Sequence, residues 1–245
     1  MSLKFYKLGI ALLCMVMFCA CSSKNKDIVP DKKPEELYIE AYKALASERY
    51  NDARINLEAI DNRYPFGPYA HQVQLDLIYT YYKDRENELA LAEIDKFIRL
   101  NPSDEHLDYV LYMRGLTNLQ KATDRFLDFI HVDTYDRDTA FYEVAYKDFK
   151  KIYETFPHSL YAADAYARMV SIRSTLARHE LDIIKFYHKK QAYISAARHC
   201  HKLLLKFHDS DEVKDALKIL IDSYKHLNLH EAAANTQKLY DLNFN

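Results

Sequence analysis

A pattern of one small and two apolar residues recurs along this chain of 245 residues and constrains its fold more than any other feature. An apolar residue follows the small one after four positions, and another follows after three more. Such spacings place side chains on one face of an α-helix, and a proline five positions later stops that helix. The occurrences are Ala53, Leu57, Ile60 and Pro65; Ala90, Ile94, Phe97 and Pro102; Ala145, Phe149, Ile152 and Pro157; Ala196, Cys200 and Leu203, with His208 in place of proline; and, more weakly, Ala232, Thr236 and Leu239.

The pattern has a period of 37 residues between its first two occurrences and 36 between its last two. Ala41 and Ile78 lie twelve residues before the first two small residues, as expected for a preceding helix. This organisation resembles the tetratricopeptide repeat, a helix–turn–helix unit of about 34 residues with small residues where its helices cross. We predict an all-α tetratricopeptide-repeat superhelix of about five units with a concave groove. An unrelated helical bundle would have to match five sites and three prolines by coincidence.

Composition excludes several classes of function. With three glycines and six prolines, the chain has no glycine-rich phosphate loop, no nucleophile elbow and no sheet with many tight turns. A net charge of −2 provides no strong field for nucleic acid. We therefore expect a protein-binding chain, without enzymatic activity and without a nucleic-acid partner.

The amino-terminal residues have the features of a bacterial lipoprotein signal. Lys4 and Lys7 precede an apolar run of eleven residues, 8–18, which is too short to span a bilayer comfortably. The following Cys-Ala-Cys-Ser-Ser resembles a lipobox, so residues 1–20 are predicted to be a signal peptide and Cys21 to be acylated. The alternative is ordinary secretory cleavage or an uncleaved anchor.

Acylation of Cys21 would fasten the chain to a membrane through several acyl chains. Ser22, rather than Asp, resembles the residue of lipoproteins that are exported to the outer membrane. Residues 21–34 then form a flexible tether. Only Cys200 would remain as a thiol after cleavage, so no disulfide is expected. We also expect no cofactor, and the only bound group expected is the covalent lipid on Cys21.

Two irregularities interrupt the repeats. Thirty residues separate Gly115 from Ala145, where the first two repeats have twelve. A second surplus gives the fourth repeat a long first helix, residues 160–189, without Pro or Gly. The predicted repeat domain is 35–245, with amino-terminal repeats 35–157 that contain an insertion at 116–139, and carboxyl-terminal repeats 158–245.

Histidines close together in the sequence do not predict a metal site. His199 and His201 flank Cys200, but residues two apart on a helix point about 200° from each other. Cys200 occupies a core position of its repeat, where a thiol acts as a small apolar group. His226 and His230 straddle a predicted turn. We expect no metal.

The first helix of each pair lines the groove in tetratricopeptide arrays, and six tyrosines of the first three such helices occupy groove-facing positions in the repeat register. Tyrosines offer rigid contact area with hydroxyl groups, which suits an extended peptide that carries aromatic residues. Alternatively, some of them pack between helices. The predicted groove residues are Tyr38, Tyr42, Gln72, Leu75, Tyr79, Tyr82, Tyr109 and Tyr112, with Phe66 at the groove mouth in a turn that Pro65, Gly67 and Pro68 shape.

Long motifs carry a more specific resemblance. Asp61-Asn-Arg-Tyr-Pro-Phe-Gly-Pro-Tyr69, Gln72-Val-Gln-Leu-Asp-Leu-Ile-Tyr79, Phe97-Ile-Arg-Leu-Asn-Pro102 and Asp108-Tyr-Val-Leu-Tyr-Met-Arg-Gly-Leu-Thr-Asn118 are similar to the BamD family of outer-membrane assembly lipoproteins. The resemblance covers nearly all of the chain after the signal and is densest over residues 53–118. It departs toward the carboxyl end, where His208 replaces a proline.

This resemblance implies a lipid-anchored location on the periplasmic face of the outer membrane. The implied partners are a BamA-like barrel subunit, companion Bam lipoproteins and the carboxyl-terminal strand of unfolded outer-membrane proteins. By position, Arg198, His199 and Lys202 are the candidates for docking on the barrel subunit. The rival hypothesis is another tetratricopeptide lipoprotein, a scaffold of pilus biogenesis or of cell division.

Overall fold

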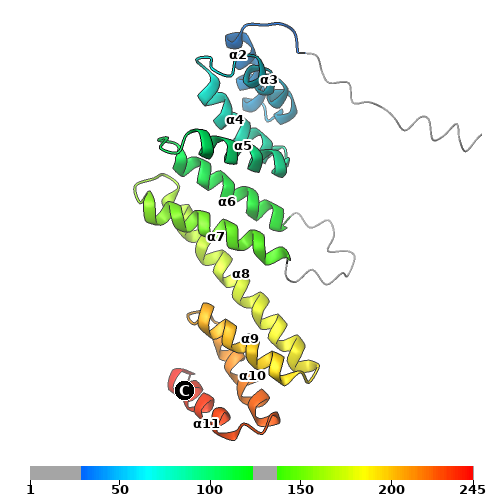
Figure 1. Ribbon diagram of the computed structural model, residues 1–245, viewed down its shortest axis with the longest axis vertical. Helices are drawn as coiled ribbons and strands as arrows, with labels where there is room; N and C mark the ends of the chain where they lie inside the picture. Colours follow the sequence, from blue (N-terminus) through cyan, green and yellow to red (C-terminus); the bar gives the residue numbers. More distant parts are fainter. Residues whose placement is uncertain (1–28, 124–136, 245) are drawn as a thin grey trace, which may run out of the picture. The chain divides into compact units, whose positions relative to one another are not determined.

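A computed structural model describes residues 29–123 and 137–244 (Figure 1). The described residues form ten α-helices and no strand, so the all-α prediction is confirmed. Their contacts divide the chain into two compact units, one ending at Ala70 and the other beginning at His71, and each unit is described by itself. The helices are α2 (Pro34–Ala46), α3 (Tyr50–Arg63), α4 (Ala70–Lys83), α5 (Asn87–Leu100), α6 (Leu107–Thr123), α7 (Arg137–Thr155), α8 (Ala162–Lys189), α9 (Tyr193–Lys206), α10 (Val213–His226) and α11 (His230–Phe244).

Consecutive helices pair as hairpins of the tetratricopeptide type. The helices α2 and α3 form the hairpin of the first unit, and the second unit contains four more, from α4 to α11 (Figure 1). The long α8 has 28 residues, as the surplus in the fourth repeat predicted. The predicted insertion lengthens α6 to Thr123, and its residues 124–136 lie outside the described residues, as do the predicted signal peptide and Cys21.

The part of the predicted tether that the structure describes is held against α3. The Arg63 guanidinium donates hydrogen bonds to the carbonyl oxygens of Val29 and Pro30, at 2.6 and 2.9 Å. Pro34 then begins α2. Residues 29 and 30 of the predicted tether are therefore fixed to α3 by their backbone carbonyls.

The repeat register is confirmed by burial. In the first four occurrences of the pattern, every small and apolar position has no solvent-accessible area: Ala53, Leu57, Ile60, Ala90, Ile94, Phe97, Ala145, Phe149, Ile152, Ala196, Cys200 and Leu203. The weak fifth occurrence differs, because Leu239 is 46% exposed and Ala233 is buried in place of Ala232. Among the described helices, α11 has its main contacts with α10, which covers one of its faces.

Gly115 shows why a small residue is needed where two helices cross. A Cβ atom added to this glycine of α6 would lie 2.7 Å from the aromatic ring of Phe149 on α7. Real Cβ atoms do not approach carbon atoms that closely, so the Phe149 ring occupies the space that any larger residue at position 115 would need. The predicted role of small residues at helix crossings is therefore confirmed here.

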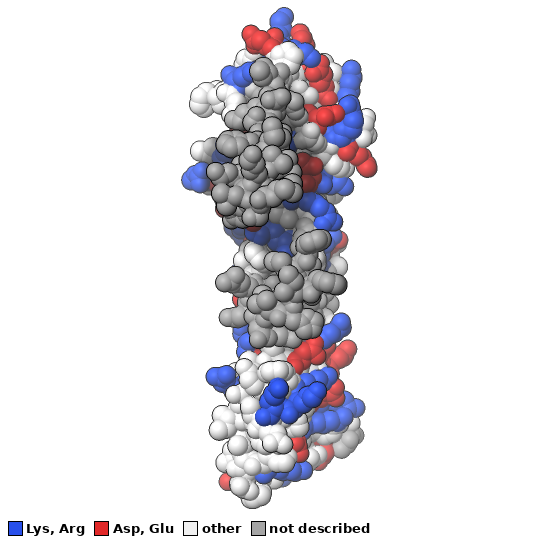
Figure 2. Space-filling view, turned by 90° about the vertical axis from the view of Figure 1, so that its right-hand side faces the viewer, with Lys and Arg blue, Asp and Glu red and all other residues white. Residues whose placement is uncertain are grey.

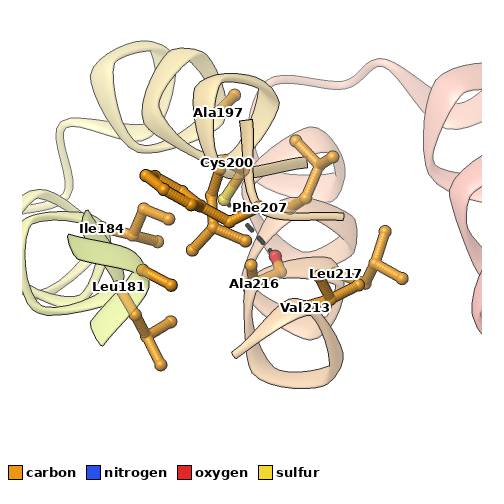
Figure 3. Close-up of a cluster of buried hydrophobic side chains, with 11 residues drawn as sticks. Leu181, Ile184, Ala197, Cys200, Phe207, Val213, Ala216 and Leu217 are labelled. Carbon is orange, nitrogen blue, oxygen red and sulfur yellow. Dashed lines mark hydrogen bonds between the residues drawn. The ribbon is translucent and has the colours of Figure 1, made fainter. Parts of the chain in front are cut away.

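Cys200 lies in a core of buried side chains from α8, α9 and α10 (Figure 3). Its thiol donates a hydrogen bond to the carbonyl oxygen of Ala216, at 3.3 Å. Burial raises the pKa of this thiol to about 12. The thiol is therefore protonated and unreactive, and the prediction that Cys200 acts as a small apolar residue is confirmed.

Four hairpins turn through a residue with a left-handed backbone that is not glycine. After α8, for example, Gln191 has φ of 59°, and the N–H of the next residue, Ala192, donates to the Tyr187 carbonyl at 3.0 Å. This is the Schellman arrangement, in which glycine is the usual left-handed residue. The four residues are Glu48, Arg85, Gln191 and Asn228.

Replacing Gln191 with glycine is expected to stabilise the protein by about 0.5–1 kcal/mol. Glycine removes the Cβ penalty of the left-handed conformation, which exceeds its own cost in backbone entropy. Thermal unfolding should show a higher midpoint. The neighbouring Lys190, with φ of −80°, is the matched control, and Lys190→Gly should lower the midpoint. A lower midpoint for Gln191→Gly would contradict the strain at this turn.

Candidate peptide-binding surface

Two of the predicted groove tyrosines form an aromatic cluster with a third tyrosine that the sequence did not single out. Tyr109 and Tyr112 lie on α6, and Tyr161 immediately precedes α8. The Tyr112 and Tyr161 rings stack with centroids 4.7 Å apart, and the Tyr109 ring lies 5.9 Å from Tyr161. Hairpin stacking thus brings together aromatic rings that are about fifty residues apart in the sequence.

Polar contacts fix the Tyr112 ring. Its hydroxyl donates a hydrogen bond of 2.6 Å to the Asp164 carboxylate, which also accepts one from the Arg168 guanidinium. Although burial opposes the effect, these two bonds hold the pKa of Asp164 below its ordinary value. The Arg168 guanidinium lies 5.9 Å from the centroid of the Tyr112 ring. Tyr112 is therefore oriented in advance of any binding event.

The four predicted tyrosines of the second unit differ in exposure. Burial, together with the nearby Asp76 carboxylate, raises the pKa of the Tyr109 hydroxyl well above its usual range. Tyr79 is 38% exposed on α4, and Tyr82 and Tyr112 are half-buried. Tyr82, Tyr109 and Tyr112 are therefore all partly accessible to solvent, and Tyr79 is more exposed than any of them.

A cleft of about 480 Å³ lies beside this cluster, where the first helices of three successive hairpins meet. Tyr82 is the one predicted groove residue that lines it, and Arg85 and Arg168 give it two cationic side chains. Clefts of this volume are typical of sites that hold a compact group such as a side chain. The lining residues are Tyr82 and Arg85, Leu116, Leu119, Gln120 and Thr123 of α6, Tyr142 of α7, and Arg168, Ser171, Ile172 and Thr175 of α8.

The structure places the other predicted groove residues differently. Gln72 is exposed, and its amide donates to the Asp76 carboxylate at 2.9 Å. Leu75 is only 4% exposed and packs in the core with Ile78 and Phe97, so its expected place on the groove surface is wrong. The reason is that α4 turns Leu75 toward α5 and α6.

The first unit contains the remaining three aromatic candidates. Tyr38 stacks on Tyr69, with ring centroids 5.0 Å apart. Tyr42 is 65% exposed, and Phe66 is 99% exposed in the turn that follows α3. Both rings are therefore accessible to a partner, as the prediction for the groove requires.

The predicted docking residues on α9 have two kinds of environment. His199 Nδ1 and Lys202 Nζ lie 2.6 and 2.8 Å from the carboxylate oxygens of Glu180, which is 4% exposed on α8. Lys202 therefore also balances the charge of a buried carboxylate, to which His199 is hydrogen-bonded. Arg198 is exposed. On the face shown in Figure 2, Lys and Arg side chains gather beside an uncharged area at the carboxyl-terminal end.

Sequence reasoning missed residues that meet only through stacking of adjacent hairpins. Tyr161, Asp164 and Arg168 are one example. Another is His71, whose Nε2 lies 2.7 Å from Asp104 although the two are 33 residues apart. A search for polar residues separated by about one repeat period would have found this pair, because equivalent positions of adjacent repeats lie side by side.

A family model described as "YfiO: Outer membrane lipoprotein" matches residues 30–239. The match spans most of the chain, including both units. The chain belongs to this family. Proteins of the same kind carry the name BamD, and the recognition made from the sequence motifs is confirmed.

Relatives from three organisms are similar over almost the whole chain, and each is named outer membrane protein assembly factor BamD. The protein of Vibrio cholerae is 41% identical over 238 residues, which cover 97% of this chain and 98% of that protein. The proteins of Neisseria meningitidis and Haemophilus influenzae are 37% and 34% identical, and the matches cover 97% and 96% of this BamD-family chain and 88% and 90% of those proteins.

Among solved structures, a tetratricopeptide repeat protein from Parabacteroides merdae matches with a TM-score of 0.28 and 17% identity, over 85% of this chain and 79% of that one. In the part of the BamD-family chain that the structure describes, no helix has the length and apolar character needed to cross a membrane.

Proposed function

We propose that this chain is a lipid-anchored adaptor of the machinery that assembles β-barrel proteins in the outer membrane. In this role it holds the carboxyl-terminal strand of an unfolded outer-membrane protein (the client) and docks on a BamA-like barrel subunit, alongside companion Bam lipoproteins. The relatives' name, outer membrane protein assembly factor, supports the assembly role. No catalytic step is proposed, because a scaffold role requires only binding.

The observation that supports client binding best is the cleft between α4, α6 and α8 beside the tyrosine cluster. An extended strand that ends in an aromatic residue has one large side chain to bury and a backbone with unpaired hydrogen-bonding groups. The cleft offers the volume for that side chain. Tyr79 and Tyr82, on the adjoining α4, offer aromatic area at a low cost in side-chain entropy.

Docking on the barrel subunit is assigned to the exposed face of α9 around Arg198. Arginine is enriched where protein surfaces bind one another. His199 and Lys202 are predicted to contribute while they remain paired with Glu180. Cys21 carries the acyl chains that hold the protein on the periplasmic face of the outer membrane in this proposal.

Replacing Tyr79 and Tyr82 together with alanine is expected to weaken binding of a client carboxyl-terminal peptide by about 1–3 kcal/mol, if both rings contact it. Fluorescence anisotropy of a labelled peptide with a terminal phenylalanine measures this affinity. Tyr153, 48% exposed on α7 and outside the cleft, is the matched control, and Tyr153→Ala should leave the affinity unchanged. Equal affinity of the double variant and the parent, with the fold intact by circular dichroism, would contradict client binding at this surface.

The rival function, a scaffold for pilus biogenesis or cell division, predicts different partners. Isolation of the acylated protein from outer membranes, followed by mass spectrometry of what accompanies it, separates the two. Recovery of a barrel subunit that is lost with Arg198→Glu supports the proposal. Recovery of pilus or division proteins without a barrel subunit would favour the rival.

A further inference from the structure

We propose that His71, Asp104 and His106 form a binding site for a divalent transition-metal ion such as Zn²⁺. Within residues 29–123 and 137–244, this is the one group of three His, Cys, Asp or Glu side chains whose ligand atoms all lie within 4.8 Å of one another. The inference departs from the expectation of no metal, which considered only histidines close together in the sequence. It does not depend on client binding.

The three side chains already converge. His71 Nε2 lies 2.7 Å from Asp104 Oδ2, and His106 Nδ1 lies 3.2 Å from Asp104 Oδ1. Ligand atoms at about 2.0–2.1 Å from a tetrahedral Zn²⁺ are about 3.3 Å from one another. Side-chain rotations that move the ligand atoms by less than about 1.5 Å would give this geometry. No helix has to move.

The ligand types suit such an ion. Two imidazole nitrogens and a carboxylate oxygen are a common Zn²⁺ set, and a water molecule completes the tetrahedron. The Asp104 carboxylate accepts the His106 backbone N–H at 2.8 Å and has both imidazole rings beside its oxygens. The negative charge of this carboxylate favours a bound metal cation over a further hydrogen-bond donor.

Core packing holds the ligands in place. His71 lies in the first turn of α4, and its ring centroid is 5.5 Å from that of Phe97, which has no solvent-accessible area. Asp104 lies in the turn between α5 and α6, where its Oδ1 accepts the His106 backbone N–H at 2.8 Å. An ion bound here joins α4 to the start of α6, so it links two successive hairpins.

A second His–Asp–His group provides a matched comparison. His188 Nε2 and His226 Nε2 lie 2.7 and 3.5 Å from the same oxygen of Asp222. The His226 ring is also stacked flat on Tyr193, with centroids 4.3 Å apart and an angle of 4° between the planes. These three side chains share chemistry with the proposed site, but they do not bring three ligand atoms around one point.

Calorimetric titration of ZnCl₂ into the untagged mature lipoprotein in detergent, first stripped with a chelator, tests the proposal. We expect one equivalent to bind at this site, with affinity reduced about tenfold or more in His71→Ala and in His106→Ala, since loss of a ligand costs at least as much as loss of a group that orients one. His226→Ala should keep the affinity of the parent protein.

Thermal unfolding supplies a second measurement. Because a ligand that binds the folded state stabilises it, Zn²⁺ should raise the midpoint of the parent protein and of His226→Ala, but not that of His71→Ala. Asp104→Asn keeps the shape of the side chain and should reduce both the binding and the shift. No binding by the parent protein, or equal binding by the parent, His71→Ala and His106→Ala, would overturn the proposal.

Discussion

Replacing Arg114 with alanine is expected to lower the free energy of unfolding by about 3–5 kcal/mol. Arg114 of α6 makes a two-pronged ion pair with Asp148 of α7, with Nε–Oδ2 of 2.9 Å and Nη2–Oδ1 of 2.6 Å. The Asp148 side chain is only 4% exposed, and the hydrogen bonds from Arg114 to it, followed by its charge, raise the pKa of Arg114. Without the guanidinium, a buried carboxylate has lost its partner, which is among the most costly changes in a folded protein. Urea-induced unfolding measures the change.

A second variant tests whether the cost comes from the unpaired carboxylate. Removing both partners, in Arg114→Ala with Asp148→Ala, should be markedly less destabilising than Arg114→Ala alone. Lys150→Ala breaks an exposed pair with Glu154 on the same helix α7 and should cost less than about 0.5 kcal/mol. A loss below about 1 kcal/mol for Arg114→Ala would show that water reaches Asp148 freely.

Replacing Phe149 with alanine is expected to cost about 3–5 kcal/mol of stability. The Phe149 ring has no solvent-accessible area and packs against Gly115 and Tyr112 of α6. Its removal leaves a cavity at the crossing of α6 and α7. These helices cannot close the cavity without disturbing the ion pair of Arg114 and Asp148, which are the sequence neighbours of Gly115 and Phe149. The midpoint of thermal unfolding should fall accordingly, with the helical content retained at low temperature.

A double-mutant cycle links this ring to the glycine. Gly115→Ala places a Cβ atom 2.7 Å from the ring and should cost about 1–3 kcal/mol in the parent protein. In the Phe149→Ala background the same change should be neutral or stabilising, because the space is free and alanine favours a helix more than glycine does. Additive effects of the two substitutions would mean that the two residues do not touch.

The helical part of the fold could be predicted well because each repeat obeys local rules. The small residue and its two apolar partners occupy one face of a helix, and twelve such positions in four repeats have no exposed area. The carboxyl-terminal repeat was predicted less well. Leu239 fits the spacing of the pattern. Whether this side chain is buried depends on the helices packed against it, and the spacing does not specify them.

The candidate site could be predicted only in part. Because the groove was assigned to the first helix of each repeat, spacing alone identified Tyr79, Tyr82 and Tyr112 as groove candidates. Spacing did not show that Leu75, on the same helix, turns into the core. Nor did it show that Tyr161 stacks on Tyr112, because that contact crosses from one hairpin to the next.

The sequence by itself determined the helix type, the positions of the hairpins, the core register and the family, since all of these follow from spacings and motifs within single repeats. Only the tertiary structure decided which polar and aromatic side chains meet. The Arg114–Asp148 pair joins the two helices of one hairpin, whereas the Tyr112–Asp164 bond and the contact of His71 with Asp104 join successive hairpins. Stacking sets these contacts, because the rotation of one hairpin on the next selects which side chains face each other.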